Sequence, residues 1–97
     1  MKQPAVYVMA SGRRGTLYGG VTADLVQRVW QHREGTLGGL TQRYGVKELV
    51  WYEPHGSMEE AIAREKALKK WRRAWKLEFV KKCNPQWRDL WDEIVGA

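Results

Sequence analysis

The chain has 97 residues, 43% of them hydrophobic and 29% charged, which suits one soluble domain with a single modest core. Its formal net charge of +6 predicts a polyanionic partner, although a basic charge also occurs in proteins without one. The single cysteine excludes an internal disulfide and a thiolate-only metal site. The chain has neither an apolar run that could span a bilayer nor the apolar segment of a signal peptide, so we expect an intracellular, cytoplasmic protein.

Residues 5–21 predict a β-hairpin. Residues 5–10 are apolar and β-prone, residues 11–15 have the composition of a turn, and residues 16–21 form a second extended run. Tyr7 and Tyr18 then stand on neighbouring strands, where cross-strand packing is an alternative to a functional role. Gly19 and Gly20 weaken the second strand, as expected where a backbone turns sharply or is approached closely.

A helix is expected next, ending near residues 34–35. Thr22 suits its N-cap, and Asp24 places a negative charge in the first turn. Arg28 and His32 lie four residues apart, along one margin of the stripe formed by the apolar residues Leu25, Val26, Val29 and Trp30. A cation and a titratable imidazole therefore lie beside the core.

A loop and a third strand are predicted after this helix. Residues 35–44 hold three glycines and show no periodicity, so we expect a mobile surface loop in which Thr41, Gln42 and Arg43 could contact phosphate. Residues 46–53 are β-prone and are closed by Pro54.

A long helical segment is predicted from Ser57, which begins a capping box with Glu60. Glu65 lies in the middle of its apolar face, which is formed by Met58, Ala61, Ile62 and Leu68. A carboxylate in such a position is costly unless a cation or a metal compensates it. The alternatives are a structural ion pair with Arg28 or Arg72, or local unwinding that exposes the carboxylate.

The same segment is strongly basic. Between residues 64 and 82 there are nine Lys or Arg residues and two Glu residues, and the candidates for nucleic-acid binding are Lys69, Lys70, Arg72, Arg73 and Lys76, together with Arg43. Trp71 and Trp75 lie between these charges, and we interpret the two tryptophans mainly as packing residues. Asn84 and Pro85 predict the start of a last helix over residues 86–94.

The chain resembles the GIY-YIG nuclease superfamily, in particular its small stand-alone branch, from about residue 6 to residue 90. The resemblance lies in Ala5-Val6-Tyr7, Tyr18-Gly19-Gly20, the run DLVQRVWQH, the run EEAIAREKALKKWRRAWK and the Asn84-Pro85-x-Trp87-Arg88 tail. The elements predicted along the chain run in the order β-β-α-β-α-α. The resemblance implies an α+β fold for residues 1–97 as one domain, in which helices flank a small three-stranded antiparallel sheet. It also implies hydrolysis of phosphodiester bonds with one divalent metal ion.

The family's functional residues match five positions of this chain. The resemblance implies catalytic roles for Tyr7, Tyr18, Arg28, His32 and Glu65, with Glu65 also the ligand of Mg²⁺ or Mn²⁺. Two motif positions depart from the family pattern, because Ala5 replaces a glycine and Gly19 replaces the usual isoleucine. The second change removes packing from the second strand and leaves the Tyr18 hydroxyl in place.

These groups suit phosphodiester cleavage. Glu65 would hold the metal ion, and Arg28 would stabilise charge on the phosphate. Either Tyr7 or Tyr18 would orient or deprotonate the attacking water, and His32 would relay the proton. We therefore expect an endonuclease that acts on DNA rather than RNA, in repair or processing, without a membrane partner. The alternatives are a nucleic-acid-binding module with a decayed nuclease site, and a domain that docks a partner protein.

Overall fold

The structure, a computed structural model, describes residues 3–12, 15–35 and 45–96. Its strands and helices are β1 (Ala5–Ala10), β2 (Leu17–Thr22), α1 (Leu25–Glu34), β3 (Glu48–Pro54), α3 (Met58–Lys69), α4 (Arg73–Cys83) and α5 (Trp91–Ile94). The strands form an antiparallel sheet in the order β2-β1-β3. The α+β fold with a three-stranded antiparallel sheet is confirmed.

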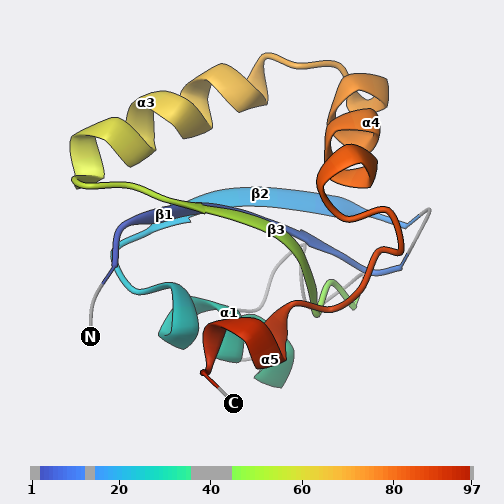
Figure 1. Cartoon of the computed structure of the whole chain (residues 1–97), viewed down its shortest axis with the longest axis horizontal. Helices are drawn as coiled ribbons and strands as arrows, with labels where there is room; N and C mark the ends of the chain where they lie inside the picture. Colours follow the sequence, from blue (N-terminus) through green and yellow to red (C-terminus); the bar gives the residue numbers. More distant parts are fainter. Residues whose placement is uncertain (1–2, 13–14, 36–44, 97) are drawn as a thin grey trace.

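Helices cover both faces of the sheet. In Figure 1, α3 and α4 lie on one side of it, and α1 and α5 lie on the other. The central strand β1 therefore buries alternate side chains in two separate cores, with Tyr7 and Met9 on the α1 side and Val6 and Ala10 on the α3 side. A strand that is covered on both faces needs apolar residues at consecutive positions, which explains the uninterrupted apolar run of residues 5–10.

The start of α1 differs from the prediction. Thr22 is the last residue of β2, and Asp24 is the N-cap, where its carboxylate accepts a hydrogen bond of 3.2 Å from the backbone N–H of Gln27. The Thr22 hydroxyl instead accepts a hydrogen bond from the backbone N–H of Asp24. Gly35 ends the helix as expected, with a φ of 74° that favours glycine.

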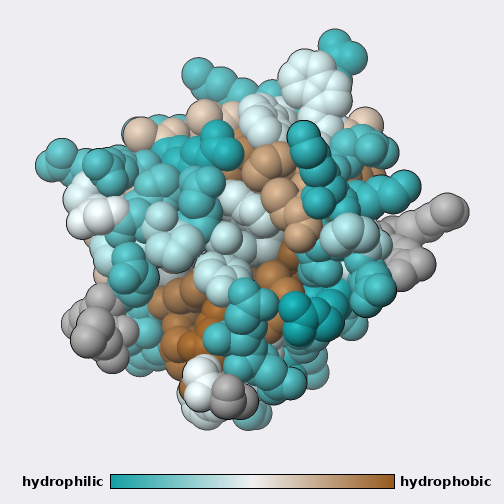
Figure 2. All heavy atoms as spheres, in the orientation of Figure 1, coloured by the Kyte–Doolittle hydropathy of each residue, from teal (hydrophilic) through white to brown (hydrophobic). Residues whose placement is uncertain are grey.

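The buried face of α1 is also rotated relative to the predicted stripe. Leu25 and Val29 are buried as expected, but Val26 is 39% exposed and Trp30 is 48% exposed. His32 takes their place, with only 3% of its surface exposed. Figure 2 shows hydrophobic residues gathered on the part of the surface where α1 and α5 lie. Because it is almost fully buried, the His32 imidazole is part of the core and does not lie at its margin.

The predicted long helical segment is two helices. Its start is confirmed, because the Ser57 hydroxyl accepts a hydrogen bond from the backbone N–H of Glu60. The chain leaves the helix after Lys69, and Arg72 has an extended backbone with a ψ of 151°. This break turns α4 back over the sheet, where Phe79 meets Trp71 edge to face at 5.3 Å.

The predicted helix over residues 86–94 is wrong for most of its length, since α5 begins only at Trp91. Asn84 is the C-cap of α4 and is buried. Its amide donates hydrogen bonds to the carbonyls of Val50 and Arg88 and accepts one from the backbone N–H of Arg88. An asparagine that satisfies backbone groups in this way stabilises a loop instead of a helix start.

Among the described residues, no helix is both long enough and apolar enough to span a membrane.

Candidate active site

Tyr7 lies at the centre of the sheet, and its ring covers Gly20. The two residues are register partners on β1 and β2, and only 1% of the Tyr7 surface is exposed. A Cβ atom on Gly20 would lie 2.7 Å from the Tyr7 hydroxyl oxygen and 2.8 Å from Cζ. The close approach expected at the glycine pair is therefore that of the Tyr7 ring, so Gly20 contacts the site although no role was predicted for it.

His32 holds the Tyr7 hydroxyl. The hydroxyl oxygen and Nε2 of His32 are 3.1 Å apart, and both groups are buried. Burial and then the charge of Arg28 lower the pKa of His32 below its ordinary value. The imidazole is therefore neutral at neutral pH. Its Nδ1 is buried and has no hydrogen-bond partner among the described residues.

The pKa of Tyr7 is raised, mainly by burial and next by the neighbouring Tyr18. The charge of Glu65 also raises this pKa, and the charge of Arg28 opposes the shift. Tyr7 is therefore a neutral phenol at physiological pH. In this state it can donate a proton to Nε2 of His32 while its oxygen accepts another.

Tyr18 and Arg28 complete the group on this side of the sheet. The Tyr18 ring is partly exposed on the edge strand β2, with its centroid 5.2 Å from that of His32 and 6.4 Å from that of Tyr7. Arg28 lies one turn before His32 on α1, and no carboxylate of the described residues forms an ion pair with it. Its effect on the pKa of both Tyr7 and His32 places its charge at the same site.

Glu65 reaches the site from α3. It is 7% exposed, and its Oε2 atom lies 3.1 Å from Nζ of Lys69, one helical turn later. The short distance makes an ion pair, but Oε2 has no hydrogen-bond partner of acceptable geometry within the described residues. The predicted partners Arg28 and Arg72 were wrong, and α3 is not unwound at Glu65. The sequence-predicted DNA contact Lys69 thus also neutralises this carboxylate.

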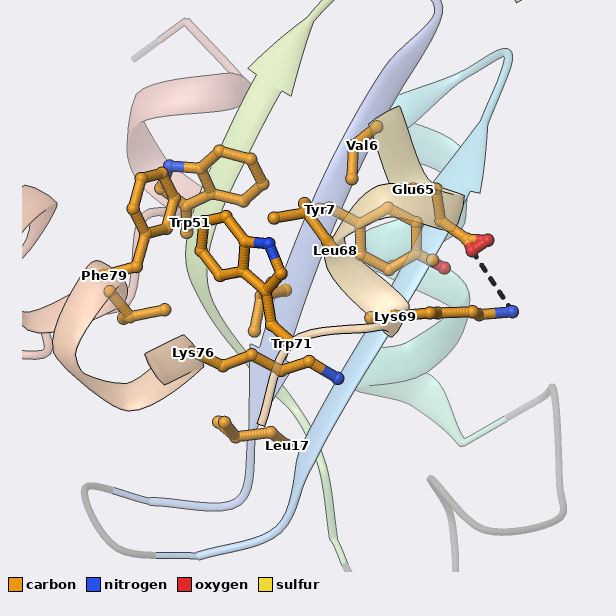
Figure 3. Close-up of a pocket in the computed structure, with 14 residues that line it drawn as sticks. Val6, Tyr7, Leu17, Trp51, Glu65, Leu68, Lys69, Trp71, Lys76 and Phe79 are labelled. Carbon is orange, nitrogen blue, oxygen red and sulfur yellow. Dashed lines mark ion pairs between the residues drawn. The ribbon is translucent and has the colours of Figure 1, made fainter. Parts of the chain in front are cut away.

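Tyr7 and Glu65 both line one cleft of about 60 Å³ between the sheet and the helices α3 and α4 (Figure 3). Gly19 and Gly20 of the edge strand line it too. Figure 3 shows the Tyr7 hydroxyl directed to the same side of the cleft as the Glu65–Lys69 pair.

A divalent ion would fit Glu65. A buried carboxylate oxygen without a hydrogen bond is a suitable ligand for Mg²⁺ or Mn²⁺, which take one or two carboxylates and complete their coordination with water and phosphate oxygens. In the described part of the chain, no cluster of three or more acidic, His or Cys side chains offers a second metal centre. Glu65 would therefore be the principal protein ligand.

Two of the predicted nucleic-acid-binding residues in the chain's second half, Lys69 and Lys76, line the cleft. Lys70, Arg72 and Arg73 are exposed. Arg73 donates a hydrogen bond to the carbonyl of Gly15, so it also supports the β1–β2 turn. The predicted phosphate contacts Thr41, Gln42 and Arg43 lie outside the described residues.

The interpretation of both tryptophans as packing residues holds for only one of them. Trp71 packs against the core on the α3 side. Trp75 is 58% exposed, and the guanidinium of Arg72 lies 5.9 Å from its ring centroid. Because α4 begins after the break at Arg72, Trp71 and Trp75 do not share one helix face.

Three comparisons place the chain among known proteins. Residues 3–78 match the family described as the GIY-YIG catalytic domain. A UPF0213 protein of Pediococcus pentosaceus is 33% identical over 67 residues, covering 69% of this chain and 70% of its own. A UPF0213 protein of Syntrophus aciditrophicus is 32% identical over 87 residues, covering 89% of this chain and 98% of its own.

The fold matches a solved structure as well. The solution NMR structure of a UPF0213 protein from Bacillus halodurans superposes with a TM-score of 0.57 and 26% identity, covering 93% of this chain and 95% of that one. The name UPF0213 states neither a substrate nor a reaction. Family match, relatives and fold agree, and the chain belongs to the GIY-YIG family of catalytic domains, whose members are generally endonucleases.

Proposed function

We propose that the protein is a metal-dependent endonuclease that hydrolyses phosphodiester bonds in DNA, in a repair or processing role. The observation that carries this proposal is the convergence of Tyr7, His32 and Glu65. Two of these groups share a buried hydrogen bond, and the third is a buried carboxylate in the same cleft. Such costly buried polar groups are characteristic of functional sites.

In the proposed reaction, Tyr7 and His32 act together as the base. The attacking water gives a proton to the Tyr7 oxygen as Tyr7 passes its own proton to Nε2 of His32, so the phenol stays neutral throughout. The lowered pKa of His32 and the raised pKa of Tyr7 support this relay, because the imidazole is free to accept and the phenol does not ionise by itself.

Arg28 and Tyr18 would contact the phosphate. Arg28 carries five donors in a fork that fits phosphate oxygens, and no carboxylate of the described residues competes for it. Tyr18, partly exposed beside His32, is suited to orient the attacking water or a phosphate oxygen.

Glu65 would hold a Mg²⁺ or Mn²⁺ ion, with Lys69 balancing its charge when the ion is absent. When bound, the ion would supply electrostatic stabilisation of the negative charge on the phosphate. Lys69 is 68% exposed at its side chain, so it can turn to the DNA backbone when the ion takes its place.

The test is cleavage of labelled duplex, flap, junction and single-stranded DNA by the purified chain, with Mg²⁺, with Mn²⁺ and with a chelator. Metal-dependent cutting of at least one DNA supports the proposal, and Arg28→Ala controls for contaminating nuclease. DNA binding without cutting under any of these conditions would contradict it and identify a binding module with a decayed site. A preference for the matching RNA would contradict the assignment of DNA.

A further inference from the structure

The cleft beside the candidate active site is more apolar than phosphodiester chemistry requires. Its wall is mainly apolar and is formed by Val6, Val8, Leu17, Leu68, Trp71 and Phe79. The space in it is about 60 Å³, which is room for a small flat group and not for a large ligand. These residues belong to the core on the α3 side or pack against it, and phosphate groups gain nothing from such a wall.

Three aromatic rings, those of Trp51, Trp71 and Phe79, help to line the cleft. Phe79 meets Trp71 and Trp51 edge to face, with ring centroids 5.3 Å and 5.2 Å apart. Figure 3 shows the Trp71 indole in the middle of the cleft, between Leu68 and Lys76. A flat ring system inserted here would meet aromatic and aliphatic surfaces, which is the environment that binds nucleobases by stacking.

Gly19 keeps this cleft open. It pairs with Val8 in the sheet, and its two neighbours on the same face of β2, Leu17 and Val21, pack against the core on the α3 side. Gly19 is thus the one position of this row without a side chain. A Cβ atom at Gly19 would have only the Tyr7 carbonyl oxygen within 4 Å, at 3.9 Å, so the backbone itself would accept a larger residue.

The charges at the cleft fit a nucleic-acid strand. Glu65 and Tyr7 line it beside the ammonium of Lys69, and Lys76 lines it on the α4 side (Figure 3). The exposed residues Lys70 and Arg72 continue the positive charge outside. A strand whose phosphate lies at Glu65 would have cations along its backbone and an apolar recess next to it.

We propose that this cleft binds an unpaired nucleobase of single-stranded DNA, next to the phosphate that lies at Glu65 and Tyr7. A base that is stacked and paired in a duplex cannot enter a recess of this kind, so the cleft selects single-stranded or locally unpaired DNA. The position of the phosphate rests on the proposed nuclease function. Binding of the base does not require cleavage and can be tested without metal.

The test compares two fluorescent probes in the presence of a chelator, a short oligothymidylate and a strand of the same length whose nucleotides are all abasic. Both carry the same charge, so their difference in affinity measures the contribution of the bases alone. By fluorescence anisotropy, the wild-type chain should bind the oligothymidylate about tenfold more tightly than the abasic strand. Equal affinity for the two strands would overturn the proposal.

Gly19→Ile places a branched side chain in the recess and should remove most of the preference for bases while leaving the affinity for the abasic strand unchanged. Gly19→Ala should lie between this variant and the wild type. A full preference for bases in correctly folded Gly19→Ile would show that the bases bind elsewhere. If Gly19→Ile does not fold, the indole N–H signals of Trp51 and Trp71 in wild-type NMR spectra should shift with oligothymidylate and not with the abasic strand, and unchanged signals would overturn the proposal.

The result is independent of catalysis. A chain that prefers bases but never cuts DNA would leave the cleft proposal intact and contradict the nuclease assignment. A chain that cuts DNA with Mg²⁺ but binds both probes equally would support the nuclease assignment and overturn the cleft proposal.

Discussion

The Tyr7 hydroxyl and Nε2 of His32 are 3.1 Å apart, in a buried contact that joins the central strand β1 to helix α1 across 25 residues of sequence. Removing the Tyr7 hydroxyl would leave His32 without a polar partner among the described residues, because its Nδ1 is already unpaired. Removing His32 would take away the partner of the Tyr7 hydroxyl. A buried polar contact of this kind lowers stability when one of its partners is removed.

Adding a side chain at Gly20 should disrupt this contact between Tyr7 and His32. In Gly20→Ala the new Cβ would lie 2.7 Å from the Tyr7 hydroxyl oxygen, and the buried ring has to move away from His32. We expect a loss of about 1 to 3 kcal/mol in the free energy of unfolding and a large loss of cleavage. Gly56→Ala is the matched control, because its Cβ would meet only Glu60 at an ordinary 3.5 Å. Equal urea midpoints for the two variants would contradict the proposed crowding.

Arg28→Ala should lower the cleavage rate by about 10² to 10³ while DNA affinity and the fold are retained, since its donors act on charge that develops in the transition state. Arg33→Ala is the control on the same helix. Arg33 forms an ion pair with Asp89 and lies 5.1 Å from the Trp91 ring centroid, so its loss should affect stability rather than cleavage. Single-turnover rates and thermal melts separate the two effects. Unfolding of Arg28→Ala would assign Arg28 a structural role.

Glu65→Gln should abolish metal-dependent cleavage with little change in stability. The cation left behind is Lys69, whose side chain is 68% exposed and can be hydrated, so we expect a loss below about 1 kcal/mol. A buried cation would instead cost about 3 to 5 kcal/mol. Thermal melts with and without Mn²⁺ should also show that the metal stabilises the wild type and not the variant. Cleavage by Glu65→Gln at the wild-type rate would refute the role of Glu65 as the metal ligand.

The lowered pKa of His32 predicts a pH-dependent stability. In the unfolded chain His32 takes up a proton near its ordinary pKa of about 6.5, whereas the folded chain holds it neutral to a lower pH. Below about pH 6.5 the unfolded state therefore binds more protons, and the free energy of unfolding falls as the pH drops to the folded pKa. Urea unfolding across this window should show a smaller decline in His32→Gln than in the wild type. An equal decline in both would mean that His32 does not cause it.

DNA binding should depend steeply on salt. The quadruple variant with Ala at Lys69, Lys70, Arg72 and Arg73 should flatten the slope of log affinity against log salt by up to about four phosphate contacts. Arg73 also donates a hydrogen bond to Gly15, so a melt of the variant must accompany the titration. An unchanged slope would show that DNA does not contact the surface formed by α3 and α4.

The sequence by itself determined the strands, the helices α1 and α3 and five candidate residues of the site. These follow from local signals, such as the apolar run of β1, the Ser57 cap and the placement of Glu65 on an apolar face. The family motifs added the roles that local signals could not supply. Both kinds of signal act over a few residues or match a known pattern, which is why they can be read without coordinates.

Only the tertiary structure decided how these residues meet. The rotation of α1 that buries His32 and exposes Trp30 depends on the contacts that α1 makes with the sheet, such as that of His32 with Tyr7. A helical wheel alone does not distinguish a packed imidazole from an exposed indole. The bonds of Asn84 depend on the position of β3. In each case the deciding energy comes from partners distant in sequence, which no local pattern contains.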